Sequence, residues 1–82
     1  SFGSNDDAKL YLKHALELNP NGIDPNYFYG DFLIEQGKYQ EAIAALEHAL
    51  KAPSRPNRPV ADIGRKAEIN EKISFARKKI NQ

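Results

Sequence analysis

The chain has 82 residues, of which 40% are hydrophobic, and this length supports one small domain that buries about 60% of the surface of the unfolded chain. It contains no cysteine, which excludes disulfide bonds and thiolate metal sites, and no apolar run approaches the ~20 residues that cross a bilayer. The formal net charge is +1, but residues 1–54 carry −4 and residues 55–82 carry +5, so an acidic part precedes a basic part.

Residues 4–22 predict the first helix and the turn that follows it. Ser4 is the expected N-cap, and two aspartates come soon after it, where carboxylates favour the positive end of the helix dipole. The helix is expected to end near Leu18. The sequence Asn19-Pro20-Asn21-Gly22 then combines a residue that cannot continue a helix with residues suited to a turn.

Residues 23–54 predict a hairpin of two helices. Asp24 is expected to cap the first of them, with Pro25 at its first helical position, and Gly37 marks the turn at its end. The second helix is expected from about residue 39 to residue 51. The two helices would therefore be neighbours in space as well as in sequence.

Small and apolar residues predict a close contact between these two helices. Gly30 costs about 1 kcal/mol relative to alanine inside a helix, so the close approach of a neighbouring helix is its expected reason. Ala42 and Leu46 stand four residues apart and belong to one face of the second helix. We expect this face to pack toward Tyr29 and Leu33.

Residues 55–59 form a proline-rich loop that should be stiff. Two interpretations of residues 60–80 compete: one continuous helix, or a third repeat of the hairpin with a turn near Asn70-Glu71. We favour one helix, because no start or stop signal interrupts the segment. Its apolar stripe is expected at Ile69, Ile73, Ala76 and Ile80.

The hairpin resembles a tetratricopeptide repeat, a helix-turn-helix unit of about 34 residues with the pattern W-x2-L-G-x2-Y, A-x3-F and P. The positions that carry the resemblance are Asn26, Tyr29, Gly30, Leu33, Ala42, Leu46 and Pro53. Two of them depart from the pattern, because Asn26 replaces the aromatic residue and Pro53 falls one residue early.

The chain is also similar to itself after a shift of 34 residues, as a repeat protein should be. The coincident pairs include Ala8 and Ala42, Leu12 and Leu46, Ala15 and Ala49, Leu16 and Leu50, Gly30 and Gly64, and Ala42 and Ala76. Residues 4–22 thus resemble the second helix of a truncated repeat, and residues 23–54 resemble a complete one. We expect the sequence to be a fragment of a larger protein.

The resemblance implies an all-α fold, a right-handed stack of about four helices whose open end is capped by the helix 60–80. It also implies a non-catalytic scaffold that binds a protein or peptide on the concave surface formed by the first helices of the repeats. The residues that would contact the partner are Asp24, Tyr27, Asp31, Ile34 and Glu35. Their carboxylates favour a basic or mixed peptide over an acidic one.

Two features predict apolar surface that the core does not need. A two-repeat core does not need both Phe28 and Phe32 to be filled, so at least one of them should pack against the C-terminal helix or an upstream helix. The helix with Ala8, Leu12 and Leu16 would keep one apolar side uncovered without such an upstream helix, and exposed patches promote association. Self-association as a homodimer is therefore an alternative function.

Other functions are less favoured. The basic helix 60–80 could contact nucleic acid, but its last basic residues also suit the negative end of the helix dipole. No phosphate-binding loop, nucleophile elbow or zinc-binding helix motif occurs, so we predict no enzyme, cofactor or metal. His14 and His48 coincide under the repeat shift, and neither has a cysteine or second histidine nearby in sequence.

Overall fold

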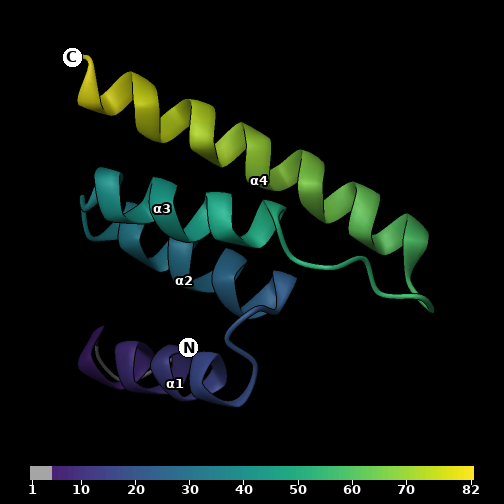
Figure 1. Cartoon of the computed structure of the whole chain (residues 1–82). Coiled ribbons are helices and arrows are strands. Elements are labelled where there is room, and N and C mark those ends of the chain that lie inside the picture. The colour runs from purple at the N-terminus through teal and green to yellow at the C-terminus, as the bar shows by residue number, and fades with distance from the viewer. Residues whose placement is uncertain (1–4) are drawn as a thin grey trace.

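The structure is a computed structural model that describes residues 5–82, and every regular element within them is an α-helix (Figure 1). The helices are α1 (Asn5–Leu18), α2 (Ile23–Glu35), α3 (Tyr39–Leu50) and α4 (Pro59–Ile80). They stack with α1 and α4 at opposite ends and the α2–α3 hairpin between them (Figure 1). The predicted all-α stack of four helices is confirmed. Ser4, the predicted N-cap of α1, lies outside the described residues.

The turn between α2 and α3 is set by Gly37. Its φ is +75°, a left-handed conformation that glycine adopts without a steric penalty. The amides of Gly37 and Lys38 donate to the carbonyls of Ile34 and Leu33, each at 2.9 Å, and so close the end of α2. The chain reverses here, and α3 runs back along α2 (Figure 1).

Gly30 allows α2 and α3 to approach closely. A Cβ atom at this position would lie 2.6 Å from Cγ of Leu46, which is too short for any real contact between carbon atoms. Leu46 and Ala42 are fully buried. The helix contact expected from the glycine is therefore present.

The core lies where α2, α3 and α4 meet. Its buried members are Ile23, Tyr27, Leu46, Ala49, Ala52, Ile69 and Ile73. The apolar stripe of α4 is buried as far as Ala76. The neighbouring Phe75 packs its ring against the ring of Tyr39 of α3, with ring centroids 6.5 Å apart. Ile80, predicted to continue the stripe, is 39% exposed and lines an open hollow beside Tyr39 and Gln40.

The start of α2 differs from the prediction. Its N-cap is Gly22, and Asp24 lies inside the first turn without capping it. Asn26 is buried, and its Nδ2 atom donates to the carbonyls of Pro20 at 3.0 Å and Gly22 at 2.8 Å. An aromatic side chain could not make these two bonds. Asn26 therefore fixes the turn that joins α1 to α2.

α1 is the least covered helix of the stack. Among the described helices it packs against α2 alone, and it contains no buried residue. Ala8, Leu12, Ala15 and Leu16, which correspond to the packing face of α3, are only partly buried. The other helices that the structure describes therefore leave one side of α1 uncovered.

Candidate protein-binding surface

The five residues predicted to contact a partner lie along α2 but have different surroundings. Asp24, Tyr27 and Asp31 each contact side chains of α4. Ile34 packs partly buried against the core, and Glu35 is exposed. The predicted face is thus shared between α4 and open surface.

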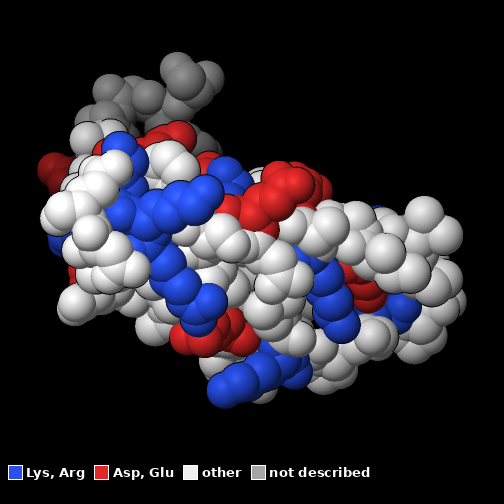
Figure 2. All heavy atoms as spheres, turned by 90° about the horizontal axis from the view of Figure 1, so that it is seen from above, with Lys and Arg blue, Asp and Glu red and all other residues white. Residues whose placement is uncertain are grey.

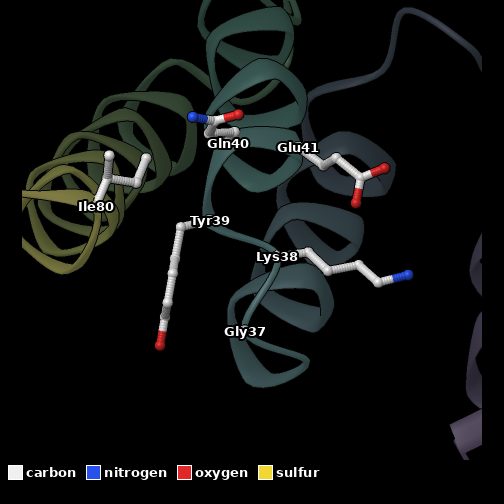
Figure 3. Close-up of a pocket in the computed structure, with 6 residues that line it drawn as sticks. All are labelled: Gly37, Lys38, Tyr39, Gln40, Glu41 and Ile80. Atoms are coloured by element: carbon white, nitrogen blue, oxygen red, sulfur yellow. The ribbon is translucent and has the colours of Figure 1, made fainter.

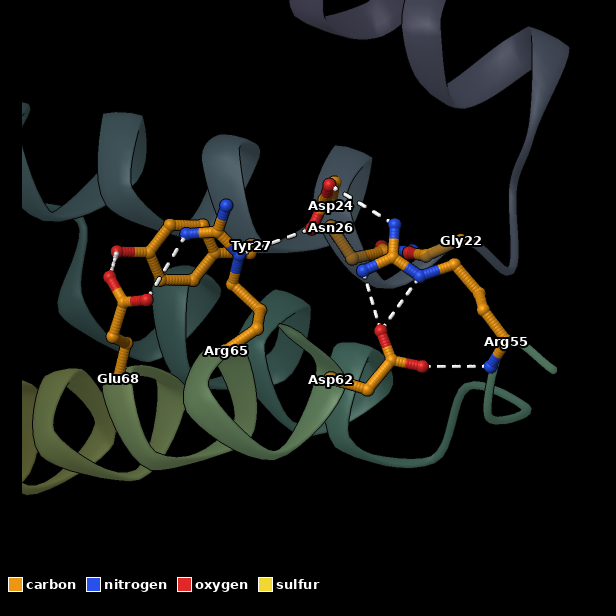
Figure 4. A network of polar contacts seen from close by, with 8 residues as sticks. All are labelled: Gly22, Asp24, Asn26, Tyr27, Arg55, Asp62, Arg65 and Glu68. Atoms are coloured by element: carbon orange, nitrogen blue, oxygen red, sulfur yellow. Dashed lines mark hydrogen bonds and ion pairs between the residues drawn. The ribbon is translucent and has the colours of Figure 1, made fainter. Parts of the chain in front are cut away.

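Tyr27 is a contact between α2 and α4 rather than an open surface residue. It is 6% exposed, and its hydroxyl donates to Oε2 of Glu68 at 3.2 Å (Figure 4). The guanidinium of Arg65 lies 4.3 Å from the centre of its ring, within the range of a cation–π contact. Burial raises the pKa of the Tyr27 hydroxyl above its ordinary value of 10.0.

Arg55 joins the proline-rich loop to both α2 and α4. Its backbone amide and its Nε atom each donate to the buried Asp62 at 2.7 Å, and its Nη1 atom lies 3.3 Å from Oδ2 of Asp24 (Figure 4). Asp24 also accepts a bond of 3.1 Å from Nε of Arg65. The hydrogen bonds from Arg55 hold the pKa of Asp62 below its ordinary value of 3.8. This network fastens the first turns of α2 and α4 together.

Asp31 is held by a separate ion pair. Nζ of Lys72 donates to Oδ1 of Asp31 at 2.7 Å, and this bond raises the pKa of the Lys72 ammonium above its ordinary value of 10.5. Asp24, Tyr27 and Asp31 therefore hold α4 in place, each through a partner on that helix.

The open part of the predicted face belongs to a groove between α1 and α2, which we call the α1–α2 groove. Its volume is about 370 Å³. The lining residues are Ala8, Tyr11 and Leu12 of α1 and Phe28, Asp31, Phe32 and Glu35 of α2. Its walls are mostly apolar side chains, and the two carboxylates supply negative charge.

A second hollow, of about 470 Å³, lies between the α2–α3 turn and the end of α4. Figure 3 shows that Lys38 and Glu41 point away from Ile80 rather than toward a common point. Side chains that hold a ligand converge on it. This hollow is therefore the weaker candidate.

The basic residues of α4 do not form an uninterrupted positive surface. Figure 2 shows Lys and Arg side chains with acidic side chains between them on the face seen from above. Arg65 and Lys72 are bound to aspartates of α2, and Arg77 lies 3.5 Å from Glu47 of α3. Much of the charge on α4 is thus used to hold the stack together.

The part of the chain that the structure describes offers no group of three or more acidic or histidine side chains able to hold a metal ion. Its helices include none that is long and apolar enough to cross a membrane. Nε2 of His48 lies 3.1 Å from Oδ1 of Asn21, and Nδ1 of His14 lies 3.9 Å from Glu17. The two histidines thus have separate surroundings.

Comparison with protein families supports the architecture. A family model described as tetratricopeptide repeat matches residues 1–58, which is more than half of the chain. The chain belongs to the tetratricopeptide repeat family. Proteins with these repeats are generally interaction scaffolds, and the match ends just before α4. Comparisons with curated proteins and with solved structures gave no match.

The sequence did not lead us to predict the α1 side of the α1–α2 groove. Ala8 and Leu12 line it, and their equivalence to Ala42 and Leu46 of α3 was the signal available to find them. The sequence did not indicate the Arg55 network either. A bond between residues 31 positions apart, such as that from Arg55 to Asp24, leaves no periodic trace in a sequence.

Proposed function

We propose that this tetratricopeptide repeat chain is a non-catalytic scaffold that binds a protein segment in the α1–α2 groove. The observation that carries the proposal is the open apolar lining with carboxylates of Asp31 and Glu35 beside it. Concave sites with an apolar floor and a few polar groups are typical of binding sites, and an amphipathic helix is the usual occupant of such a groove between helices.

The five predicted contact residues have two roles in this proposal. Asp31 and Glu35 contact the partner, because both line the groove. Asp24, Tyr27 and Ile34 support the site, because the first two hold α4 and the third packs on the core.

The partner segment should be a helix with small or apolar residues on one face and basic residues beside them. Apolar side chains would cover Phe28, Phe32 and Leu12, and basic side chains would meet the two carboxylates. An acidic segment would be repelled.

Site-specific photo-cross-linking in a lysate of the source cells tests this proposal. We expect p-benzoylphenylalanine at position 35 to capture a protein that the same group at the exposed position 71 of α4 does not capture. Excess unlabelled wild-type chain should abolish the cross-link, whereas excess Phe28→Lys chain with unchanged helical circular dichroism should not. Equal capture at both positions, no specific capture at position 35, or equal competition by Phe28→Lys would refute the groove as the binding site.

A further inference from the structure

The outward face of α4 repeats the residues with which α2 packs on α3. After the 34-residue shift the corresponding positions are Asn26 and Val60, Tyr29 and Ile63, Gly30 and Gly64, and Leu33 and Ala67. Three of the four are buried in α2, whereas all four are exposed in α4, Val60 by 82% and Ile63 by 71%. α4 therefore presents an apolar face that no helix among the described residues covers.

Gly64 is the most specific feature of this face. Its counterpart Gly30 leaves room for Leu46, since a Cβ atom there would lie 2.6 Å from Cγ of that leucine. Within the described part of the chain, a Cβ atom at Gly64 would meet nothing within 4 Å. Glycine inside an exposed helix is unfavourable relative to alanine, so a contact like that at Gly30 would explain its presence.

α1 offers the complementary surface. Leu12 corresponds to Leu46, the leucine that occupies the space above Gly30, and Ala8 corresponds to Ala42. The two residues of α3 are fully buried, whereas Ala8 and Leu12 are partly buried and line the α1–α2 groove. The chain thus carries both halves of a second helix hairpin, one in α1 and the other in α4.

We propose that α4 of one copy of the chain lies in the α1–α2 groove of a second copy, with Gly64 against Leu12. The two helices would pair as α2 and α3 pair within one chain. This inference rests on the proposed function, because it names the partner of the same groove.

Charge favours the same partner. The groove carries Asp31 and Glu35, and α4 brings a helix whose charged residues include six that are basic and three that are acidic. Applying the repeat shift to the Asp24–Arg65 pair, which spans 3.1 Å, gives a contact between Arg58 of one copy and Asp31 of the next. Opposite charges at these positions would guide the association, and salt would weaken it.

The two contact surfaces differ, so the association is head-to-tail. Each copy that uses its groove still presents its own α4 face. Heterologous contacts of this kind continue into rings or open chains rather than stopping at two copies. Growth beyond the dimer therefore distinguishes this arrangement from a symmetric pairing of two α1 helices.

Sedimentation equilibrium of the chain at rising concentration tests the proposal. We expect wild-type protein to form assemblies larger than a dimer at protein concentrations below about 1 mM. High salt should weaken this association. Gly64→Lys and Leu12→Lys should each lower the association constant about tenfold or more. Ser74→Lys and Leu10→Lys should change it little, since Ser74 lies past the region of α4 that matches α2, and Leu10 corresponds to Ala44, an exposed residue of α3.

Mixing the two interface variants gives the sharpest result. Leu12→Lys keeps an intact α4 face and Gly64→Lys keeps an intact groove, so an equimolar mixture should form one-to-one complexes that do not grow. A Cβ atom at Gly64 would meet no atom of the described residues within 4 Å, so Gly64→Lys should fold even if Leu12→Lys loses helical circular dichroism. In that case Ala8→Lys on the same face of α1 would replace it.

Several outcomes would overturn the head-to-tail pairing. These are a strictly monomeric wild-type chain, a dimer that Gly64→Lys leaves intact, or a mixture of variants that forms no complex. A monomer that still captures a different protein through position 35 would refute this pairing alone and leave the binding function of the groove in place.

Discussion

α1 and α3 occupy equivalent positions in the repeat, yet α3 is buried and α1 is not. Leu12 and Leu46 coincide after the 34-residue shift, as do Ala8 and Ala42. In α3 these residues are fully buried, and in α1 no residue is buried. The two helices therefore share a pattern and differ in their neighbours.

The difference shows that a helix of this type is stabilised by the helices on either side of it. α3 packs against both α2 and α4, while α1 packs against α2 alone. Regions with few buried apolar contacts open at lower free energy than the core does. We therefore expect α1 to be the part of the stack whose stability depends most on a partner.

The largest expected effect comes from truncating the two equivalent leucines. Leu46→Ala should lower the free energy of unfolding by about 2–5 kcal/mol, because it leaves a cavity in the centre of the core. Leu12→Ala should cost about 1 kcal/mol or less, because water already reaches that side chain. Urea unfolding at low protein concentration measures both values. Equal losses would mean that α1 is as deeply packed as α3.

The two equivalent glycines should respond with opposite signs. Gly30→Ala should lower the stability by about 1–3 kcal/mol, since its Cβ atom would overlap Leu46. Gly64→Ala should raise it by about 0.5–1 kcal/mol, since the new methyl group meets no atom and alanine favours the helix. Thermal unfolding followed by circular dichroism compares them. A stabilising Gly30→Ala would contradict the close contact between α2 and α3.

The stack itself could be predicted from the sequence, because its signals are local or periodic. Gly37 marked the α2–α3 turn, and Gly30 with Leu46 marked the contact between the two helices. Such features depend on residues a few positions apart or on one repeat length, which a single sequence displays directly. The all-α repeat fold followed from them.

The candidate site was harder to predict, because contacts between distant segments decide which of its side chains are bound to α4 and which are open. The resemblance to the repeat family implied that Tyr27 and Asp31 share the concave face, and it could not indicate that Glu68 and Lys72, each 41 residues later, would bind them. Asn26 was noticed only as a departure from the repeat pattern. Its role depends on the path of the turn at Pro20, which no periodicity describes.

A smaller effect is expected from the Arg55 network, which holds α4 in place. Because α4 covers α3, the stability of α3 should depend on pH through this network. The pKa of Asp62 is lowered, so the stability it supplies is present above pH 3.8 and is lost as the pH falls through the lower pKa of the folded state. Asp62→Asn should therefore destabilise the chain at pH 7 and flatten the loss of stability in acid. Urea unfolding between pH 7 and pH 2 tests this, with Glu71→Gln on the exposed side of α4 as the control. If Asp62→Asn left the loss of stability in acid unchanged, Asp62 would not be the source of that loss.

The smallest expected effect is the coupling between Asp31 and Lys72, which a double-mutant cycle with Asp31→Asn and Lys72→Met measures. Their side chains are 36% and 32% exposed, so water screens the pair and a coupling of about 0.2–1 kcal/mol is expected. It should be present at neutral pH and disappear as the pH rises through the raised pKa of Lys72, above 10.5. Glu35→Ala, in the open groove, should change stability by less than about 0.5 kcal/mol. A coupling of zero would mean that α4 is held by its apolar stripe and the Arg55 network without this pair. The burial of α3 would then owe nothing to the ion pair between Asp31 and Lys72.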